Sequence, residues 1–127
     1  MDYPKQVIIF ASAHVAIFDF IGDKNKSMHW REILRLYLDH IREHMCCSEH
    51  WVEGKTLMCA DVQESIEAVK KVLNVAVQSE RAKGQGIALQ SLMPYLQKFM
   101  DSCEINTPFC AKFVITFMPW ANFTMGL

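Results

Sequence analysis

The sequence lacks an excess of charge of either sign. Its 127 residues carry 13 lysines and arginines and 14 aspartates and glutamates, giving a formal net charge of -1 at pH 7 with the histidines neutral. A chain with this balance has no overall electrostatic attraction for nucleic acids or acidic membranes. Any binding of phosphate groups would therefore depend on a local cluster of basic residues.

The sequence also lacks the cysteine patterns of secreted and redox-active proteins. It has five cysteines, an odd number, and their spacings form neither a disulfide framework nor a Cys-x-x-Cys motif. The first residues, MDYPKQV, contain no basic region followed by an apolar run and a cleavage site of small residues, as a signal peptide would. We therefore expect a cytoplasmic or otherwise intracellular protein with mostly free thiols.

Phosphate-binding loops are missing as well. The letters GKT at 54–56 resemble the end of a P-loop, but Glu49 occupies the position of the required first glycine. The stretch GQGIAL, which begins at Gly84, resembles a dinucleotide fingerprint, but Leu89 replaces its third glycine. Both glycine-containing stretches are better interpreted as places where helices end.

No motif for acid-base or nucleophilic catalysis is present. Ser12, His14 and Asp19 are polar residues within apolar surroundings, but neither a nucleophile elbow nor paired carboxylates accompany them. A histidine on an apolar helix is more often a hydrogen-bonded core residue than a general base. We therefore expect a protein without enzymatic activity and without a cofactor.

Apolar side chains, by contrast, are abundant. Hydrophobic residues make up 51% of the chain, charged residues make up 21%, and eight residues are methionine. Soluble domains average about 45–50% apolar and about 25% charged residues, so this chain has apolar surface to spare. Such surface favours association with another protein, and flexible methionine side chains adapt well to a partner.

The apolar residues recur at helical spacing in most of the chain. The first segment, Val7–Ile21, is almost entirely apolar and ends before Gly22, and at fifteen residues we expect it to be too short to span a membrane. It is therefore predicted to be a central or interface helix. A second helix is predicted from Ser27, with one apolar face formed by Trp30, Leu34, Tyr37, Ile41 and Met45. A third is predicted from a capping box at Asp61 and Glu64, with one apolar face formed by Val62, Ile66, Val69, Leu73 and Ala76. A fourth is predicted to run through Leu92, Leu96, Phe99 and Cys103.

The last segment, 109–118, suits either a helix or a strand. Thr107 and Pro108 form a typical helix start, but the letters FCAKFVITFM also have high strand propensity. The connections are short and no convincing hairpin is present. Residues 1–127 are therefore predicted to form a single all-α domain, a compact bundle of about five helices.

A cluster of histidines and cysteines between residues 40 and 59 suggests a zinc site as an alternative. On a continuous helix the spacing of His40, His44 and Cys47 brings all three side chains to one side, and Cys59 could supply a fourth ligand. The same arc borders the apolar face, where neutral histidines and free cysteines commonly pack. We expect no metal, and chelation should then leave the unfolding transition unchanged.

A second alternative is nucleic-acid binding through basic residues on the second helix. Arginines along one helix face can follow a phosphate backbone, but Glu32, Asp39 and Glu43 on the same helix would repel phosphate. The residues of this basic stripe are Lys24, Lys26, Arg31, Arg35 and Arg42.

The function that the sequence favours is interaction rather than catalysis. We expect a small intracellular regulatory or protein-protein interaction module that forms a homodimer or higher oligomer, contacts partners through an apolar helix face and has no membrane span. Short proteins of this kind are often viral accessory proteins. The residues expected at the interface are Phe18 and Phe20, together with Trp120 and Phe123 of the apolar stretch after Pro119.

Overall fold

A computed structural model describes the backbone of residues 3–45, 49–84 and 88–117, and the side chains of 4–41, 62–84 and 88–117. Five α-helices are present in these ranges, and no strand is found there. The helices are α1 (Tyr3–Ile21), α2 (Lys24–Met45), α3 (Glu49–Ala82), α4 (Leu89–Ser102) and α5 (Thr107–Phe117). The predicted all-α fold is confirmed, and residues 109–117 are helical rather than extended.

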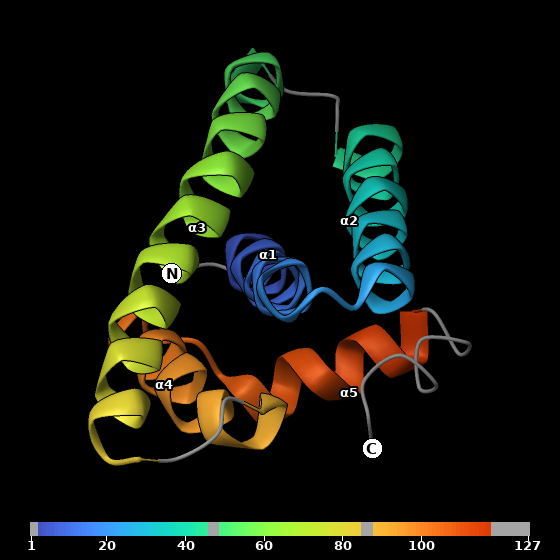
Figure 1. The fold of residues 1–127 in the computed structure, drawn as a ribbon. Coiled ribbons are helices and arrows are strands. Elements are labelled where there is room, and N and C mark those ends of the chain that lie inside the picture. Colours follow the sequence, from blue (N-terminus) through green and yellow to red (C-terminus); the bar gives the residue numbers. More distant parts are fainter. Residues whose placement is uncertain (1–2, 46–48, 85–87, 118–127) are drawn as a thin grey trace.

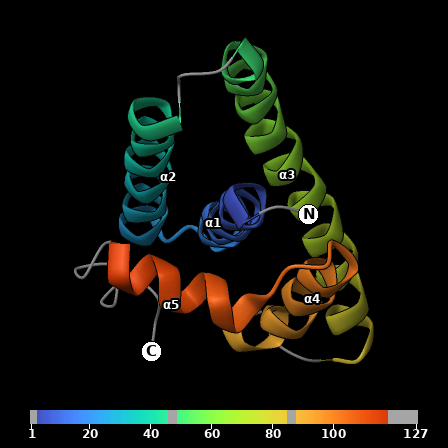
Figure 2. The same cartoon turned by 180° about the vertical axis from the view of Figure 1, so that it is seen from behind.

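Helix α1 lies at the centre of the molecule. Figure 1 views α1 nearly along its axis, with α2 and α3 on either side and with α4 and α5 across its lower face; Figure 2 shows the same arrangement from behind. Every residue from Gln6 to Phe18 is buried. A helix that is apolar on all sides requires such a central position, because any exposed side would leave apolar surface in water.

The length of α1 corrects one expectation from the sequence. The helix begins at Tyr3, four residues before the predicted apolar segment, and its Pro4–Ile21 portion is long and apolar enough to cross a membrane. Most of that portion is buried among the other helices of the same chain. Core helices of soluble proteins pass the same test of length and composition.

A tight connection joins α1 to α2. The backbone N–H of Asp23 donates to the carbonyl of Phe18 at 2.9 Å, and that of Gly22 donates to Asp19 at 3.2 Å, as in a Schellman motif. Gly22 has a φ of +82°, which side-chain-bearing residues rarely adopt. Asp23 then caps α2 by accepting a hydrogen bond from the Lys26 N–H at 3.1 Å. The sequence suggested Ser27 as the cap of this helix, and that prediction is wrong, because the cap is Asp23, four residues earlier.

Helix α3 begins much earlier than the sequence indicated. It starts at Glu49 and continues through Gly54 and Asp61, so Asp61 lies inside a helix and is not its cap. A glycine in a helix interior costs only about 1 kcal/mol relative to alanine, which packing elsewhere along a long helix can offset. The predicted apolar face of α3 is confirmed, because Ile66, Val69 and Leu73 are buried.

Capping also decides the structure of α5. Asn106 precedes the helix, and its side-chain Oδ1 accepts a hydrogen bond from the Phe109 N–H at 3.1 Å. Its own N–H donates to the Gln6 side chain of α1 at 2.9 Å. These bonds fix the first turn of a helix and hold it against α1, so the local strand propensity of this segment does not prevail.

Candidate functional site

Asp19 joins three helices at the end of α1. Its carboxylate accepts hydrogen bonds from the Ser27 hydroxyl and the Arg31 guanidinium of α2, and Lys70 Nζ of α3 lies 3.9 Å away. Burial alone would raise the pKa of the Asp19 carboxyl, but the bonds from Ser27 and Arg31, and the charges of Arg31 and Lys70, hold that pKa below its ordinary value. Asp19 therefore acts as a structural ionic junction.

We expect Asp19→Asn to lower the free energy of unfolding by about 1–2 kcal/mol, because it removes a charge-assisted hydrogen bond and two ion pairs that link three helices. Glu32→Gln is the matched control, since it breaks only an exposed pair with Arg35 on the same helix. Urea unfolding of both variants checks this. Equal effects of the two substitutions would contradict the role of Asp19 as a junction.

The basic stripe on α2 is largely paired with acidic groups of the chain itself. Arg31 binds Asp19, and Arg35 binds both Glu32 and, at 3.3 Å, Asp39. Lys26 Nζ lies 5.4 Å from the centre of the Phe18 ring, and Lys24 is exposed. The Arg42 side chain lies outside the described residues. The guanidinium groups of Arg31 and Arg35 would therefore have to exchange carboxylate partners for phosphate.

The predicted metal ligands fall mostly outside the described side chains. Only His40 can be placed: it is exposed on α2, and its ring meets the Phe117 ring edge-on at a centroid distance of 5.0 Å. The side chains of His44, Cys47 and Cys59 are not described. Within the described part of the chain, no group of three or more histidine, cysteine, aspartate or glutamate residues could hold a metal ion.

His14 is a hydrogen-bonded core residue. Its Nδ1 lies 2.7 Å from the Phe10 carbonyl, and its ring stacks on Trp30 at a centroid distance of 4.3 Å. Burial lowers the pKa of His14 from 6.5 to about 4, although the bond to Phe10 acts in the opposite direction. Ser12 likewise donates to the Ile8 carbonyl at 2.6 Å. The polar groups of this segment are thus accommodated by the α1 backbone, as expected for core residues.

Three phenylalanines of α5 form a ladder along one side of the helix. The rings of Phe109 and Phe113 stack at 6.2 Å between centroids, and those of Phe113 and Phe117 stack at 5.7 Å. Tyr37 of α2 meets Phe113 and Phe117 edge-on at 5.5 and 5.7 Å. All three phenylalanines are only half-buried. We call Tyr37, His40 and these three residues the α5 aromatic face.

This aromatic face was not predicted from the sequence, although the regular spacing of its phenylalanines can be read there. Phenylalanines spaced four residues apart fall on one side of a helix, which identifies the ladder once the segment is known to be helical. Of the residues predicted at an interface, Phe18 is 3% exposed and therefore offers a partner almost no surface. Phe20 is half-buried against the core. Trp120 and Phe123 lie outside the described residues.

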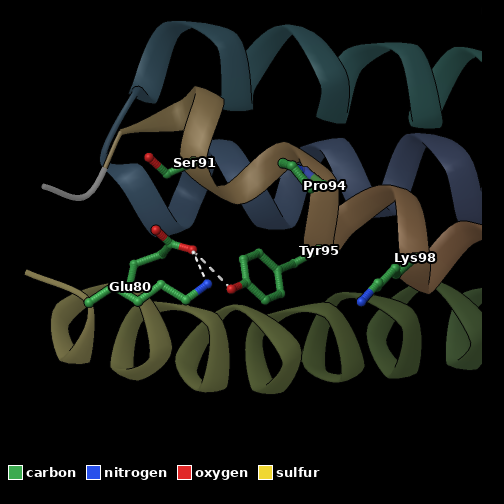
Figure 3. Close-up of a pocket in the computed structure, with 6 residues that line it drawn as sticks. Glu80, Ser91, Pro94, Tyr95 and Lys98 are labelled. Atoms are coloured by element: carbon green, nitrogen blue, oxygen red, sulfur yellow. Dashed lines mark hydrogen bonds and ion pairs between the residues drawn. The ribbon is translucent and has the colours of Figure 1, made fainter. Parts of the chain in front are cut away.

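A small pocket lies between the last turns of α3 and the first turns of α4. Its volume is about 260 Å³, and Figure 3 shows Glu80 of α3 facing Tyr95 of α4 across it. The Tyr95 hydroxyl donates to Glu80 Oε1 at 2.9 Å, and Lys83 Nζ lies 3.6 Å from the same oxygen. The other lining residues are Ser91, Pro94 and Lys98.

Comparison with known proteins adds no relative: the chain matches no protein-family model, no curated protein and no solved structure.

Proposed function

We propose that the protein is an intracellular, non-enzymatic interaction module that binds a second copy of itself through the α5 aromatic face. The observation that carries this proposal is the half-buried ladder of Phe109, Phe113 and Phe117. A row of stacked phenylalanine rings that remain partly in water leaves apolar area that association would cover. Aromatic side chains are also the residues that contribute most often to binding energy at protein interfaces.

The composition of α5 supports association with an apolar partner. The helix carries a single charged residue, Lys112, and its exposed positions are limited to Pro108, Lys112 and Thr116. Two copies of this helix would therefore bring few charges into contact. Burial of apolar area favours association, whereas an unpaired buried charge would oppose it.

The spacing of the ladder suits a symmetric dimer. Phe113 is its centre, with Phe109 and Phe117 each four residues away. If two α5 helices pack antiparallel about a two-fold axis near Phe113, Phe109 of each copy meets Phe117 of the other. Such an interface is self-complementary and closed, so it ends at the dimer instead of producing a filament.

Sedimentation velocity tests the proposal. At micromolar concentration the wild-type chain should sediment as a species of about twice its 14.7 kDa mass. Phe109→Ser should weaken association about tenfold or more, since it removes from each copy the aromatic ring that meets Phe117 of the other, and aromatic rings often carry a large share of interface binding energy. Phe109 is chosen because Tyr37 packs on the other two rings, so its loss should disturb the fold least.

Val75→Ser is the matched control, because Val75 is 67% exposed on α3 and lies outside the proposed interface. It should leave the sedimentation behaviour unchanged. Circular dichroism of both variants establishes that they remain helical. A wild-type chain that stays at 14.7 kDa at high concentration would refute self-association. Equal weakening by the two substitutions would refute the assignment of the contact to α5.

A further inference from the structure

The pocket between α3 and α4 contains a carboxylate with one oxygen that no described residue binds. Glu80 is 7% exposed, and both of its partners, the Tyr95 hydroxyl and Lys83 Nζ, contact the same oxygen, Oε1. No hydrogen bond to Oε2 is found among the described residues. Figure 3 shows this second oxygen directed toward the Ser91 end of the pocket. Trp30 Nε1 is the only buried side-chain nitrogen or oxygen without a hydrogen-bond partner in the described part of the chain, so Glu80 Oε2 is open to the solvent of the pocket and can accept a hydrogen bond from a positively charged ligand group.

A lysine without a partner lies at the other end of the same pocket. Lys98 is exposed and makes no ion pair or hydrogen bond in the part of the chain that the structure describes. Ser91, Pro94, Tyr95 and Lys98 follow one another at three- and four-residue steps, so they share one face of α4. Figure 3 shows Tyr95 between Glu80 and Lys98. The pocket therefore presents a negative and a positive group on opposite sides of an aromatic ring.

From this geometry we infer that the pocket binds a small linear zwitterion, with its ammonium group on Glu80 Oε2 and its carboxylate on Lys98. Ser91 and Lys98 are seven residues apart, which corresponds to about 10 Å along a helix. The two ligand charges must therefore be separated by a short apolar chain, which would lie along the Tyr95 and Pro94 rings. The pocket volume of about 260 Å³ suits a ligand smaller than most drug-sized molecules.

The arrangement favours a zwitterion over ligands with a single charge. A simple anion would be attracted by Lys83 and Lys98 but would face the buried carboxylate of Glu80. A simple cation would neutralise Oε2 but would leave Lys98 unpaired. A ligand with separated charges satisfies both ends. Ligand binding here does not depend on self-association, because the pocket residues lie on α3, on α4 and at Lys83 just after α3, and not on the α5 aromatic face.

A titration with 5-aminopentanoate, followed by the backbone amide NMR signals of the full chain, tests this inference. The signals of Ser91, Tyr95 and Lys98 should shift saturably at millimolar ligand. Pentylamine, pentanoate and 2-aminopentanoate are the matched ligands, since each lacks one charge or places both charges on adjacent carbons. Each should bind at least about tenfold more weakly, the loss expected when one charge-assisted hydrogen bond is removed.

Two variants locate the ligand charges. Glu80→Gln keeps an acceptor for the Tyr95 hydroxyl, and Lys98→Met keeps an unbranched side chain. Each substitution should weaken the binding of 5-aminopentanoate at least about tenfold. Lys71→Met, at an exposed position of α3, should have no effect. The inference is overturned if pocket signals do not shift at about 10 mM 5-aminopentanoate, where even a Kd of several millimolar would be visible. It is equally overturned if pentanoate or pentylamine binds as well as the zwitterion.

Discussion

Leu73→Ala is expected to lower the free energy of unfolding by about 2–5 kcal/mol. Leu73 is completely buried on α3, a helix that packs against both α1 and α4. Truncating it removes apolar area from the core and leaves a cavity that the neighbouring helices can fill only in part. The change should appear as a lower denaturation midpoint in urea with little change in the slope of the transition.

The matched control is Val75→Ala, two residues further along α3. Val75 is 67% exposed, so its truncation should change the free energy of unfolding by no more than about 0.5 kcal/mol. If Leu73→Ala were equally mild, this face of α3 would not be packed in the core.

Acid is expected to destabilise the protein through His14. In the folded chain the pKa of His14 is about 4, whereas in the unfolded chain it returns to its ordinary value of 6.5. Between these values the unfolded state binds more protons than the folded state, so stability falls as the pH is lowered. Between pH 7 and 4.5 the free energy of unfolding should fall by about 2–3 kcal/mol, at no more than about 1.4 kcal/mol per pH unit.

His14→Leu should remove this part of the pH dependence. The variant will also lose the stacking of His14 on Trp30, so its stability at pH 7 will differ from that of the wild type. The informative quantity is therefore how steeply the free energy of unfolding changes with pH in each of the two proteins, measured by urea unfolding at several pH values. Parallel profiles for wild type and variant would show that His14 titrates normally in the folded chain.

Helices and their buried faces could be predicted from the sequence because they depend on local periodicity. Trp30, Leu34, Tyr37 and Ile41 recur at three- and four-residue steps, and all are buried. The same reasoning predicted that α1 is either a central helix or an interface helix, since a helix without a polar face can be stable only when it is covered on all sides, and the structure shows the central position. These inferences require no knowledge of how the helices are arranged.

The helix boundaries were less predictable because several residues could serve as caps or interruptions. Ser27 was expected to cap α2, but it donates to Asp19 instead, and Asp23 is the cap. Gly54 and Asp61 suggested a helix boundary within what proved to be a continuous α3. A residue that can cap a helix does so only when its surroundings offer it no better partner.

The two candidate sites depend on tertiary contacts, which the sequence does not reveal. The α5 aromatic face combines Tyr37 with Phe113 and Phe117, which are far away along the chain. Glu80 and Tyr95 meet only because α4 packs against α3. The spacing of the phenylalanines could have identified the ladder, but nothing in the local sequence marked Glu80 as half of a pocket.

The most direct test of the proposed self-association is an isotope-filtered NOE experiment on a mixture of labelled and unlabelled chains. This experiment detects only contacts between different copies. We predict intermolecular signals from the rings of Phe109, Phe113 and Phe117, with those of Phe109 and Phe117 connected to each other. A dimer whose intermolecular signals arise only from other helices, or a mixture that gives no intermolecular signal at millimolar concentration, would contradict the account.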